Sequence, residues 1–227
     1  MIINFDGKTN TFSYGEALPE GCNEHYSKSF LRYLNSFYKI YKAAFEKSEF
    51  SALLTLFAFR GYADAGWDPY ESSVQIINSI KKVDEKVDNY IAKTNLHLWL
   101  YGHIMEASEP YEKIMNLLDI ITGEQYMVDK FPSNRREIPQ TPGQKILKII
   151  AKANALGFSD IQQIYKEIWD RELRNSIFHS DYSLYGNEIR INKPCKVYNI
   201  EEVYKIINYA SAYFEVIKFL HNTFIGR

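Results

Sequence analysis

Cysteine, net charge of either sign and long apolar runs are all scarce in this sequence. Its two cysteines, Cys22 and Cys195, lie far apart and have no CxxC partners. Neither a disulfide framework nor a zinc site is therefore expected. The formal net charge is only −1, whereas a dedicated duplex-binding protein is usually strongly basic. Any contact with nucleic acid must accordingly be local, as in a transient enzyme complex.

Several catalytic and nucleotide-binding signatures are also missing. The chain has no GxGxxG, P-loop, HExxH or GxSxG motif, which argues against dinucleotide binding, P-loop hydrolysis, zinc peptidase chemistry and an α/β-hydrolase nucleophile. Ser180 and Asp181 directly follow His179, but the members of a Ser-His-Asp triad meet in space rather than as neighbours in the sequence. We expect no metal site and no cofactor.

Membrane and export signals are absent as well. The longest apolar stretch, from about Leu53 to Phe59, is far shorter than the roughly 20 residues that a spanning helix needs. Residues 1–6 lack a basic region before an apolar run, so they do not resemble a signal peptide. The expectation is a soluble cytoplasmic protein with no membrane partner.

Apolar residues, in contrast, are plentiful and helically spaced. They make up 46% of the 227 residues, enough for a sizeable core. In one stretch they recur every three or four positions, at Phe30, Leu34, Phe37, Tyr41 and Phe45. We expect an all-α fold, a multi-helix bundle forming a single domain over 1–227. The helices are predicted at about 23–47, 51–62, 69–90, 96–105, from 110, 141–156, from 159 through 175, and from 200.

Turn and cap residues refine this expectation. Asp6-Gly7 and Gly186-Asn187 are typical hairpin turns, so one or two small β-hairpins should accompany the helices, and the first could extend the sheet of the second. Residues 141–144 and 159–162 have the spacing of capping boxes. Asn199 precedes the last predicted helix and should cap it.

The least regular stretch is 124–140, predicted to be a flexible loop. It contains two prolines, Pro132 and Pro139, and a basic cluster of Lys130, Arg135 and Arg136. Loops of this length are uncommon in compact domains and are often functional. The stretch is either a solvated connector or a flap that contacts RNA.

The segment Arg174–His179 carries the most informative chemistry. Arginine offers a planar fork of donors that matches phosphate oxygens. Histidine titrates near neutrality and can give or take a proton. Asn175 and His179 are four residues apart and share a helix face. Arg174 and His179 are five apart, about 140° around a helix, so they converge only if the helix frays near Phe178 or a second subunit contributes.

A simpler interpretation of the same residues is structural. Arg174 would form a surface ion pair, and His179 would lie at a helix C-terminus, where a cation is favoured. On spacing alone this interpretation is the stronger one. His103 and Glu106, which are three residues apart, are expected to be structural or surface residues rather than a metal site.

The surrounding residues favour a functional interpretation. Residues 173–182, LRNSIFHSDY, followed by YGNEIR at 185–190, resemble the HEPN superfamily, whose hallmark is Arg, four to six residues, then His, often with Asn directly after Arg. The similarity covers about 159–225. It implies a helical, usually dimeric bundle that often acts as a metal-independent endoribonuclease, in many members in phage defence or toxin–antitoxin systems. Other members only bind nucleotides or partner proteins.

We therefore expect a metal-independent endoribonuclease that cleaves RNA by attack of the 2′-hydroxyl. His179 would be the general acid/base, Arg174 would stabilise the phosphorane, and Asn175 would orient His179 or the phosphate. Substrate-binding roles are assigned to Arg171, Asp181 and Tyr182; Tyr182 follows His179 by three residues rather than the two of some toxin members, so that tyrosine's role is not transferred. A homodimer and an antitoxin-like partner are implied. The alternatives are a non-catalytic module for a nucleotide or a partner, and a helical scaffold.

Overall fold

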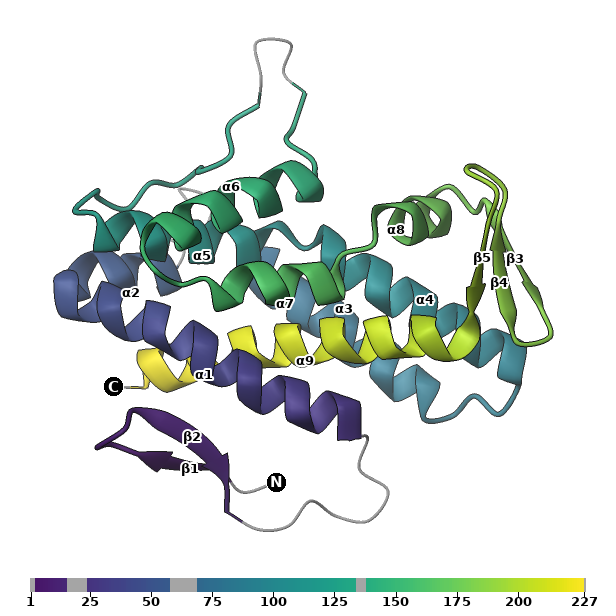
Figure 1. Cartoon of the computed structure of the whole chain (residues 1–227), viewed down its shortest axis with the longest axis horizontal. Helices are drawn as coiled ribbons and strands as arrows, with labels where there is room; N and C mark the ends of the chain where they lie inside the picture. The colour runs from purple at the N-terminus through teal and green to yellow at the C-terminus, as the bar shows by residue number, and fades with distance from the viewer. Residues whose placement is uncertain (1–2, 16–23, 58–68, 134–137, 227) are drawn as a thin grey trace.

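The computed structural model describes residues 3–15, 24–57, 69–133 and 138–226. Within them helices dominate, and two small antiparallel sheets lie at the periphery (Figure 1). The helices are α1 (Glu24–Lys47), α2 (Glu49–Phe57), α3 (Pro69–Asp84), α4 (Tyr90–Glu106), α5 (Ser108–Ile121), α6 (Pro142–Ala155), α7 (Asp160–Ile168), α8 (Arg171–Phe178) and α9 (Ile200–Ile225). The predicted multi-helix bundle with small hairpins is confirmed.

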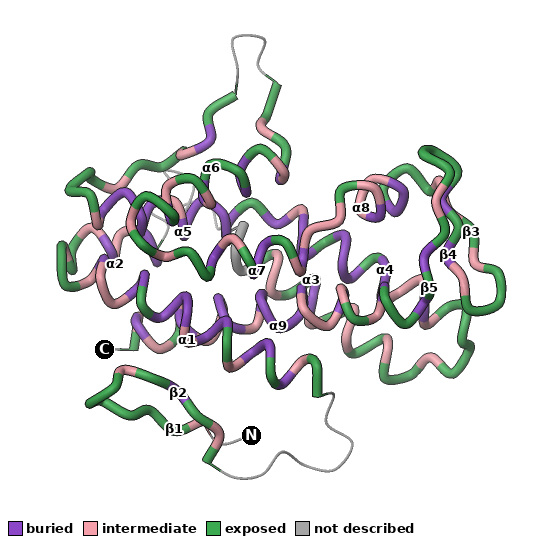
Figure 2. The backbone as a smooth tube through the Cα atoms, in the orientation of Figure 1, coloured by how far each residue is buried: buried purple, intermediate pink, exposed green. Residues whose placement is uncertain are grey.

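The long helices α1 and α9 form the centre of the bundle and pack extensively against each other. Phe37 of α1 and Tyr213 of α9 are both fully buried, with ring centroids 5.7 Å apart. The three-and-four spacing of apolar residues on α1 places Leu34 and Tyr41 on the same buried face. Figure 2 shows burial concentrated along the facing sides of these helices. The core therefore forms where the periodic pattern predicts it.

The sheets are separate, so the expectation that the two hairpins join is wrong. Strands β1 (Ile3–Asp6) and β2 (Thr11–Tyr14) pair in one sheet. Strands β3 (Tyr182–Tyr185), β4 (Glu188–Ile191) and β5 (Lys196–Asn199) form the other, in the order β3-β4-β5. The first hairpin instead packs on α1, where Phe12 donates its amide to Asn35. The third strand, β5, was not predicted.

Local capping accounts for several helix boundaries. The predicted capping box is present at Thr141, whose hydroxyl accepts from the Gln144 amide. Asn199 caps α9 by accepting from the amide of Glu201. The predicted box at Ser159 is wrong, because Ser159 is itself in a helical conformation and makes no side-chain cap.

The predicted continuous helix from 159 through 175 is also wrong, because it breaks into α7 and α8 at Trp169 and Asp170. The buried Tyr101 of α4 fixes the break. Its hydroxyl donates to the Ile168 carbonyl and accepts from the Asp170 amide. Backbone groups freed by the break are thus satisfied by a side chain from a distant helix.

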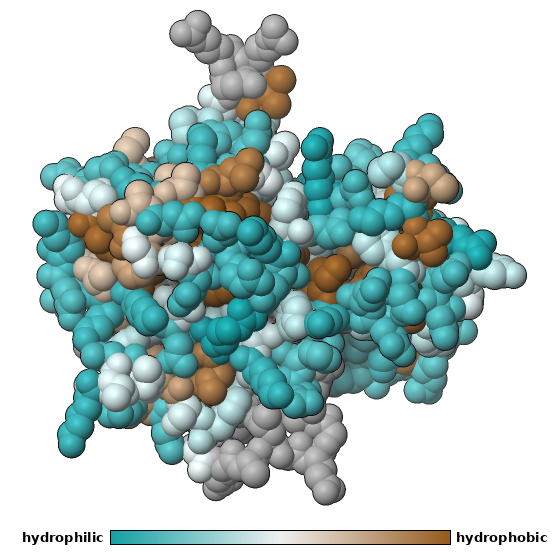
Figure 3. Space-filling model, in the orientation of Figure 1, coloured by the Kyte–Doolittle hydropathy of each residue, from teal (hydrophilic) through white to brown (hydrophobic). Residues whose placement is uncertain are grey.

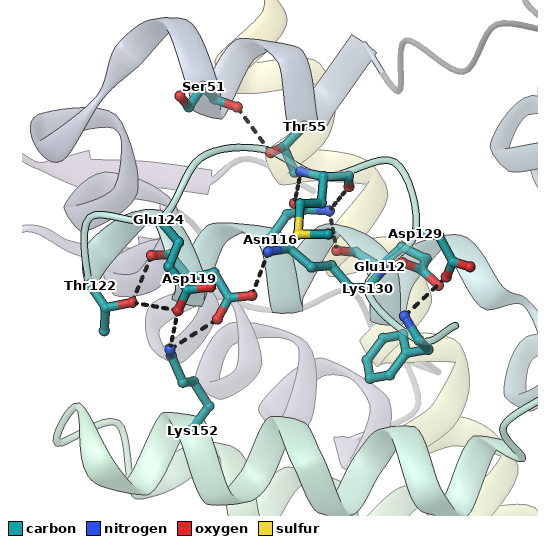
Figure 4. A network of polar contacts seen from close by, with 12 residues as sticks. Ser51, Thr55, Glu112, Asn116, Asp119, Thr122, Glu124, Asp129, Lys130 and Lys152 are labelled. Carbon is teal, nitrogen blue, oxygen red and sulfur yellow. Dashed lines mark hydrogen bonds and ion pairs between the residues drawn. The ribbon is translucent and has the colours of Figure 1, made fainter. Parts of the chain in front are cut away.

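The irregular stretch after α5 is fixed to that helix over residues 124–131 (Figure 4). Asn116 binds Met127 twice, accepting from its amide and donating to its carbonyl, both at 3.0 Å. Glu112 accepts the Lys130 amide at 2.9 Å. The Lys130 ammonium lies 2.7 Å from Asp119, and both side chains are almost fully buried. Lys130 is therefore engaged within the protein, while Arg135 and Arg136 lie outside the described residues.

Candidate functional site

The motif lies on α8, and the start of this short helix is held by a carboxylate. Asp170 accepts the amide of Leu173 at 2.9 Å, which caps the helix. Its carboxylate also accepts from the Tyr198 hydroxyl of β5 at 2.9 Å. Lys196 of the same strand lies 2.8 Å from Glu172, and that hydrogen bond raises the pKa of Lys196. The cap and the β3-β4-β5 sheet together set where α8 begins.

Arg174 is held on both edges of its guanidinium group. Nη1 donates to Oδ1 of Asn175 at 2.7 Å, and Nη2 forms an ion pair with Glu106 at the end of α4. The guanidinium carbon lies 5.0 Å from the centre of the Phe178 ring. Burial lowers the pKa of Arg174 below its ordinary value, although a guanidinium keeps its charge in proteins. Arg174 is therefore a preoriented cation rather than a freely moving one.

His179 forms the C-cap of α8, one residue beyond the helix. The chain then turns through Ser180, at φ 51°, so that the amides of Ser180 and Asp181 bond back to Ile177 and Ser176. The His179 side chain is exposed, and its imidazole makes no hydrogen bond or ion pair with any described residue. Both features of the structural interpretation are therefore present, since Arg174 is ion-paired and His179 caps a helix.

Two of the three residues expected to bind substrate are engaged within the protein. Asp181 accepts from the side chain of Asn192 at 2.9 Å. Tyr182 donates to Asn95 of α4 at 2.6 Å, and burial raises its pKa. Arg171, in contrast, is exposed. Its role and those of Asp181 and Tyr182 stay predictions.

A groove of about 830 Å³ lies between α6, α7 and α8 and is bordered by Arg174 and Asn175. Its walls include Trp169 and Leu147, and its other cations are Lys166 and Arg171. Figure 3 shows hydrophobic surface over α6 with hydrophilic side chains around it. His179 is not among the described residues that line this groove. In a single chain, Arg174 and His179 therefore face different surroundings.

A second, smaller hollow of about 250 Å³ lies beyond the other end of α8. Trp99, His103 and Phe178 line it, and Trp99 and Phe178 are 56% and 45% exposed. We call these three residues the Trp99 patch. It adjoins His179 in the sequence through Phe178, so an exposed aromatic surface lies next to the candidate acid/base.

Within the described ranges, no cluster of three or more His, Cys, Asp or Glu side chains could hold a metal ion. None of the described helices combines the length and apolarity needed to cross a bilayer. The Cys195 thiol is exposed, and Cys22 lies outside the described residues.

Comparison with known proteins identifies no relative. No family model, no curated protein and no solved structure matches the chain. The site must therefore be interpreted from its own geometry.

The sequence did not indicate three residues that shape this site. Glu106 was expected to be structural or a surface residue, yet it pairs with Arg174 from 68 positions away. Trp169 lies at the break between α7 and α8 and is half-buried in the groove wall. The exposure of Trp99 had no local signal either. Aspartate is favoured at N-cap positions, so Asp170 was the sequence signal for a new helix start at the site.

Proposed function

We propose that the protein is a metal-independent endoribonuclease of the HEPN type. The observation that carries the proposal is the end of α8, where an arginine fixed by Asn175 and Glu106 is followed, five residues on, by an exposed imidazole that has no partner among the described residues. A fixed guanidinium suits a phosphate that gains charge in the transition state. An accessible, unengaged imidazole suits proton transfer.

The reaction needs only the RNA and these side chains. An imidazole takes the proton from a 2′-hydroxyl, whose oxygen attacks the adjacent phosphorus. The bond to the 5′-oxygen breaks, and that oxygen receives a proton from a second imidazole. The products are a 2′,3′-cyclic phosphate and a 5′-hydroxyl. Arg174 stabilises the charge on the phosphorane, a contribution of about 3 kcal/mol for one such donor.

A homodimer supplies the second imidazole in this proposal. Arg174 lines the α6–α8 groove, whereas His179 is not among its lining residues, so we assign the second imidazole to a partner copy. The Trp99 patch is the surface we assign to the partner copy, because exposed aromatic side chains are enriched at interfaces. Pairing two copies through this patch would bring both His179 side chains toward a shared cleft.

The test is a cleavage assay on structured and single-stranded RNA in EDTA. Wild-type protein should cleave, and Arg174→Ala and His179→Ala should each lose activity by about 100-fold or more. His25→Ala is the matched control, since His25 is another exposed histidine, at the start of α1. New ends should carry a cyclic phosphate and a 5′-hydroxyl. Full activity in folded His179→Ala protein would refute the mechanism.

The second candidate function is a non-catalytic module that binds a nucleotide or a partner protein. The ion pair between Arg174 and Glu106 favours it, because a paired guanidinium is already neutralised. It predicts tight binding of a mononucleotide or an antitoxin-like protein, with RNA left intact after long incubation at high protein concentration. Cleavage that depends on His179 would exclude it.

A further inference from the structure

The groove between α6, α7 and α8 has an unusual charge distribution for a nearly neutral protein. Lys166, Arg171 and Arg174 all line it, and none of the described residues that line it is acidic. Lys166 and Arg171 are exposed and form no ion pair or hydrogen bond with a described residue. Two unneutralised cations at one groove favour an anionic occupant.

The wall of the groove is aromatic and aliphatic. Leu147 is 69% exposed on α6, a large apolar side chain without cover. The Trp169 indole lies against the first turn of α6, where a Cβ added to Gly143, four residues before Leu147 on the same helix, would come within 3.2 Å of the ring. A glycine at this position thus lets the indole approach the helix. A flat apolar group can pack on such a wall.

These two properties together describe a nucleotide. Single-stranded RNA combines phosphates with unstacked bases, and proteins bind it with cations along the backbone and aromatic faces for the bases. The volume of about 830 Å³ falls in the range of sites for small organic ligands. The groove also ends at Arg174 and Asn175, the residues that the proposed reaction places at the phosphate.

We infer that this groove holds the unpaired nucleotides of the RNA that flank the cleaved bond, with a base against Trp169 and phosphates at Lys166 and Arg171. This inference rests on the proposed function and deepens it, because it makes single-stranded RNA the substrate class. A duplex is excluded from the groove, since its bases are stacked and cannot reach the indole.

The experiment measures binding separately from cleavage. Fluorescein-labelled single-stranded and duplex RNA are titrated by anisotropy into His179→Ala protein in EDTA, so that the RNA stays intact. Lys166→Glu and Arg171→Glu should each weaken single-strand binding by about tenfold and lower the slope of log K against log salt by about 0.7. The control is Lys82→Glu, which reverses an exposed lysine on α3 and should bind within twofold of the parent.

A pair of variants at Leu147 identifies the occupant. Leu147 is exposed, so both substitutions should fold, as circular dichroism would verify. Leu147→Glu should weaken RNA binding by repulsion, whereas Leu147→Lys should preserve or strengthen it. Equal losses of RNA affinity in both Leu147 variants would indicate an apolar protein segment in the groove and would overturn the RNA assignment. The assignment would also be overturned if Lys166→Glu and Arg171→Glu bound RNA as tightly as Lys82→Glu.

The inference and the proposed function fail in distinguishable ways. Groove-dependent binding of single-stranded RNA without cleavage by wild-type protein would support the groove and refute the ribonuclease. If protein with an intact His179 cleaves RNA, but substitutions at Lys166, Arg171 and Leu147 leave RNA binding unchanged, the ribonuclease proposal is supported and the groove is not the RNA site.

Discussion

At the scale of single residues, the guanidinium group of Arg174 matters for its shape as well as its charge. It reaches Asn175 with one nitrogen and Glu106 with the other. A lysine has one compact ammonium and cannot reproduce both contacts along a planar edge. Asn175 and Glu106 therefore act as positioning residues that set the orientation of the cation.

Replacing Arg174 with lysine tests this geometry. We expect Arg174→Lys to lower the free energy of unfolding by about 1–3 kcal/mol, the value of hydrogen bonds to charged groups, and to reduce RNA cleavage by about 100-fold. Urea denaturation and the cleavage assay measure the two effects. Arg190→Lys is the matched control, because the Arg190 side chain is 45% exposed on β4 and does not line the groove. Wild-type stability and rate in Arg174→Lys would show that charge alone suffices.

At the scale of secondary structure elements, contacts between distant helices decide the arrangement around the site. Glu167 at the end of α7 accepts hydrogen bonds from Tyr33 at 2.6 Å and Gln163 at 3.0 Å and pairs with Arg32 of α1. Burial opposes ionisation of Glu167, but the hydrogen bonds from Arg32, Tyr33 and Gln163 outweigh it and lower its pKa below 4.5. The carboxylate thus stabilises the α1–α7 contact in its charged form.

This pKa shift predicts a pH-dependent stability. A carboxyl group whose pKa is lower in the folded state than in the unfolded state stabilises the fold fully at pH values above its unfolded pKa. This stabilisation is lost as the pH falls through the folded pKa. Glu167→Gln should therefore cost about 1 kcal/mol at pH 7, with the difference from wild type disappearing as the pH falls below about 4. Denaturation at several pH values measures it. Glu24→Gln, at an exposed pair with Lys28, is the control and should have the wild-type free energy of unfolding at every pH. A loss of stability in Glu167→Gln that does not change with pH would contradict this prediction.

Local sequence signals located most elements but not the break before the site. The capping residues Thr141 and Asn199 act through the adjacent backbone, so their effect can be predicted from neighbouring residues. The break at Asp170 depends on the Tyr101 hydroxyl, which is 69 residues away. The helical spacing of apolar residues from 161 to 169 continues up to the break and therefore does not predict it.

The site could be predicted only in part for the same reason. Arg174, Asn175 and His179 are adjacent enough for a motif to identify them. Their surroundings are set by tertiary contacts, since Glu106 comes from α4 and the wall of the groove from α6 and α7. Periodicity assigns a residue to a helix face but does not say which face stays uncovered, so the half-buried position of Trp169 in the groove wall could not be predicted.

At the scale of the whole molecule, the formal net charge is only −1, and the surfaces assigned to RNA and to a second copy are local. Lys166 and Arg171 line the groove near the start of α8, and the Trp99 patch lies beyond its end. Arg174 lies between them, since its guanidinium carbon is 5.0 Å from the centre of the Phe178 ring. Substitutions at Lys166 or Arg171 should therefore affect RNA binding, and substitutions at Trp99 should affect assembly.

Trp99→Glu should convert the proposed dimer to a monomer. Trp99 is 56% exposed on α4, so its replacement leaves the core of the chain unchanged, while a buried unpaired charge would oppose association. Sedimentation equilibrium should report a dimer for wild type and a monomer for Trp99→Glu. Leu147→Glu is the matched control, an equally drastic change on α6 that should leave the dimer intact. In the proposed dimer the second His179 comes from the partner, so cleavage in Trp99→Glu should fall by about 100-fold and recover with protein concentration as dimers reform. A monomeric variant with the wild-type rate at every concentration would mean that one chain holds a complete site.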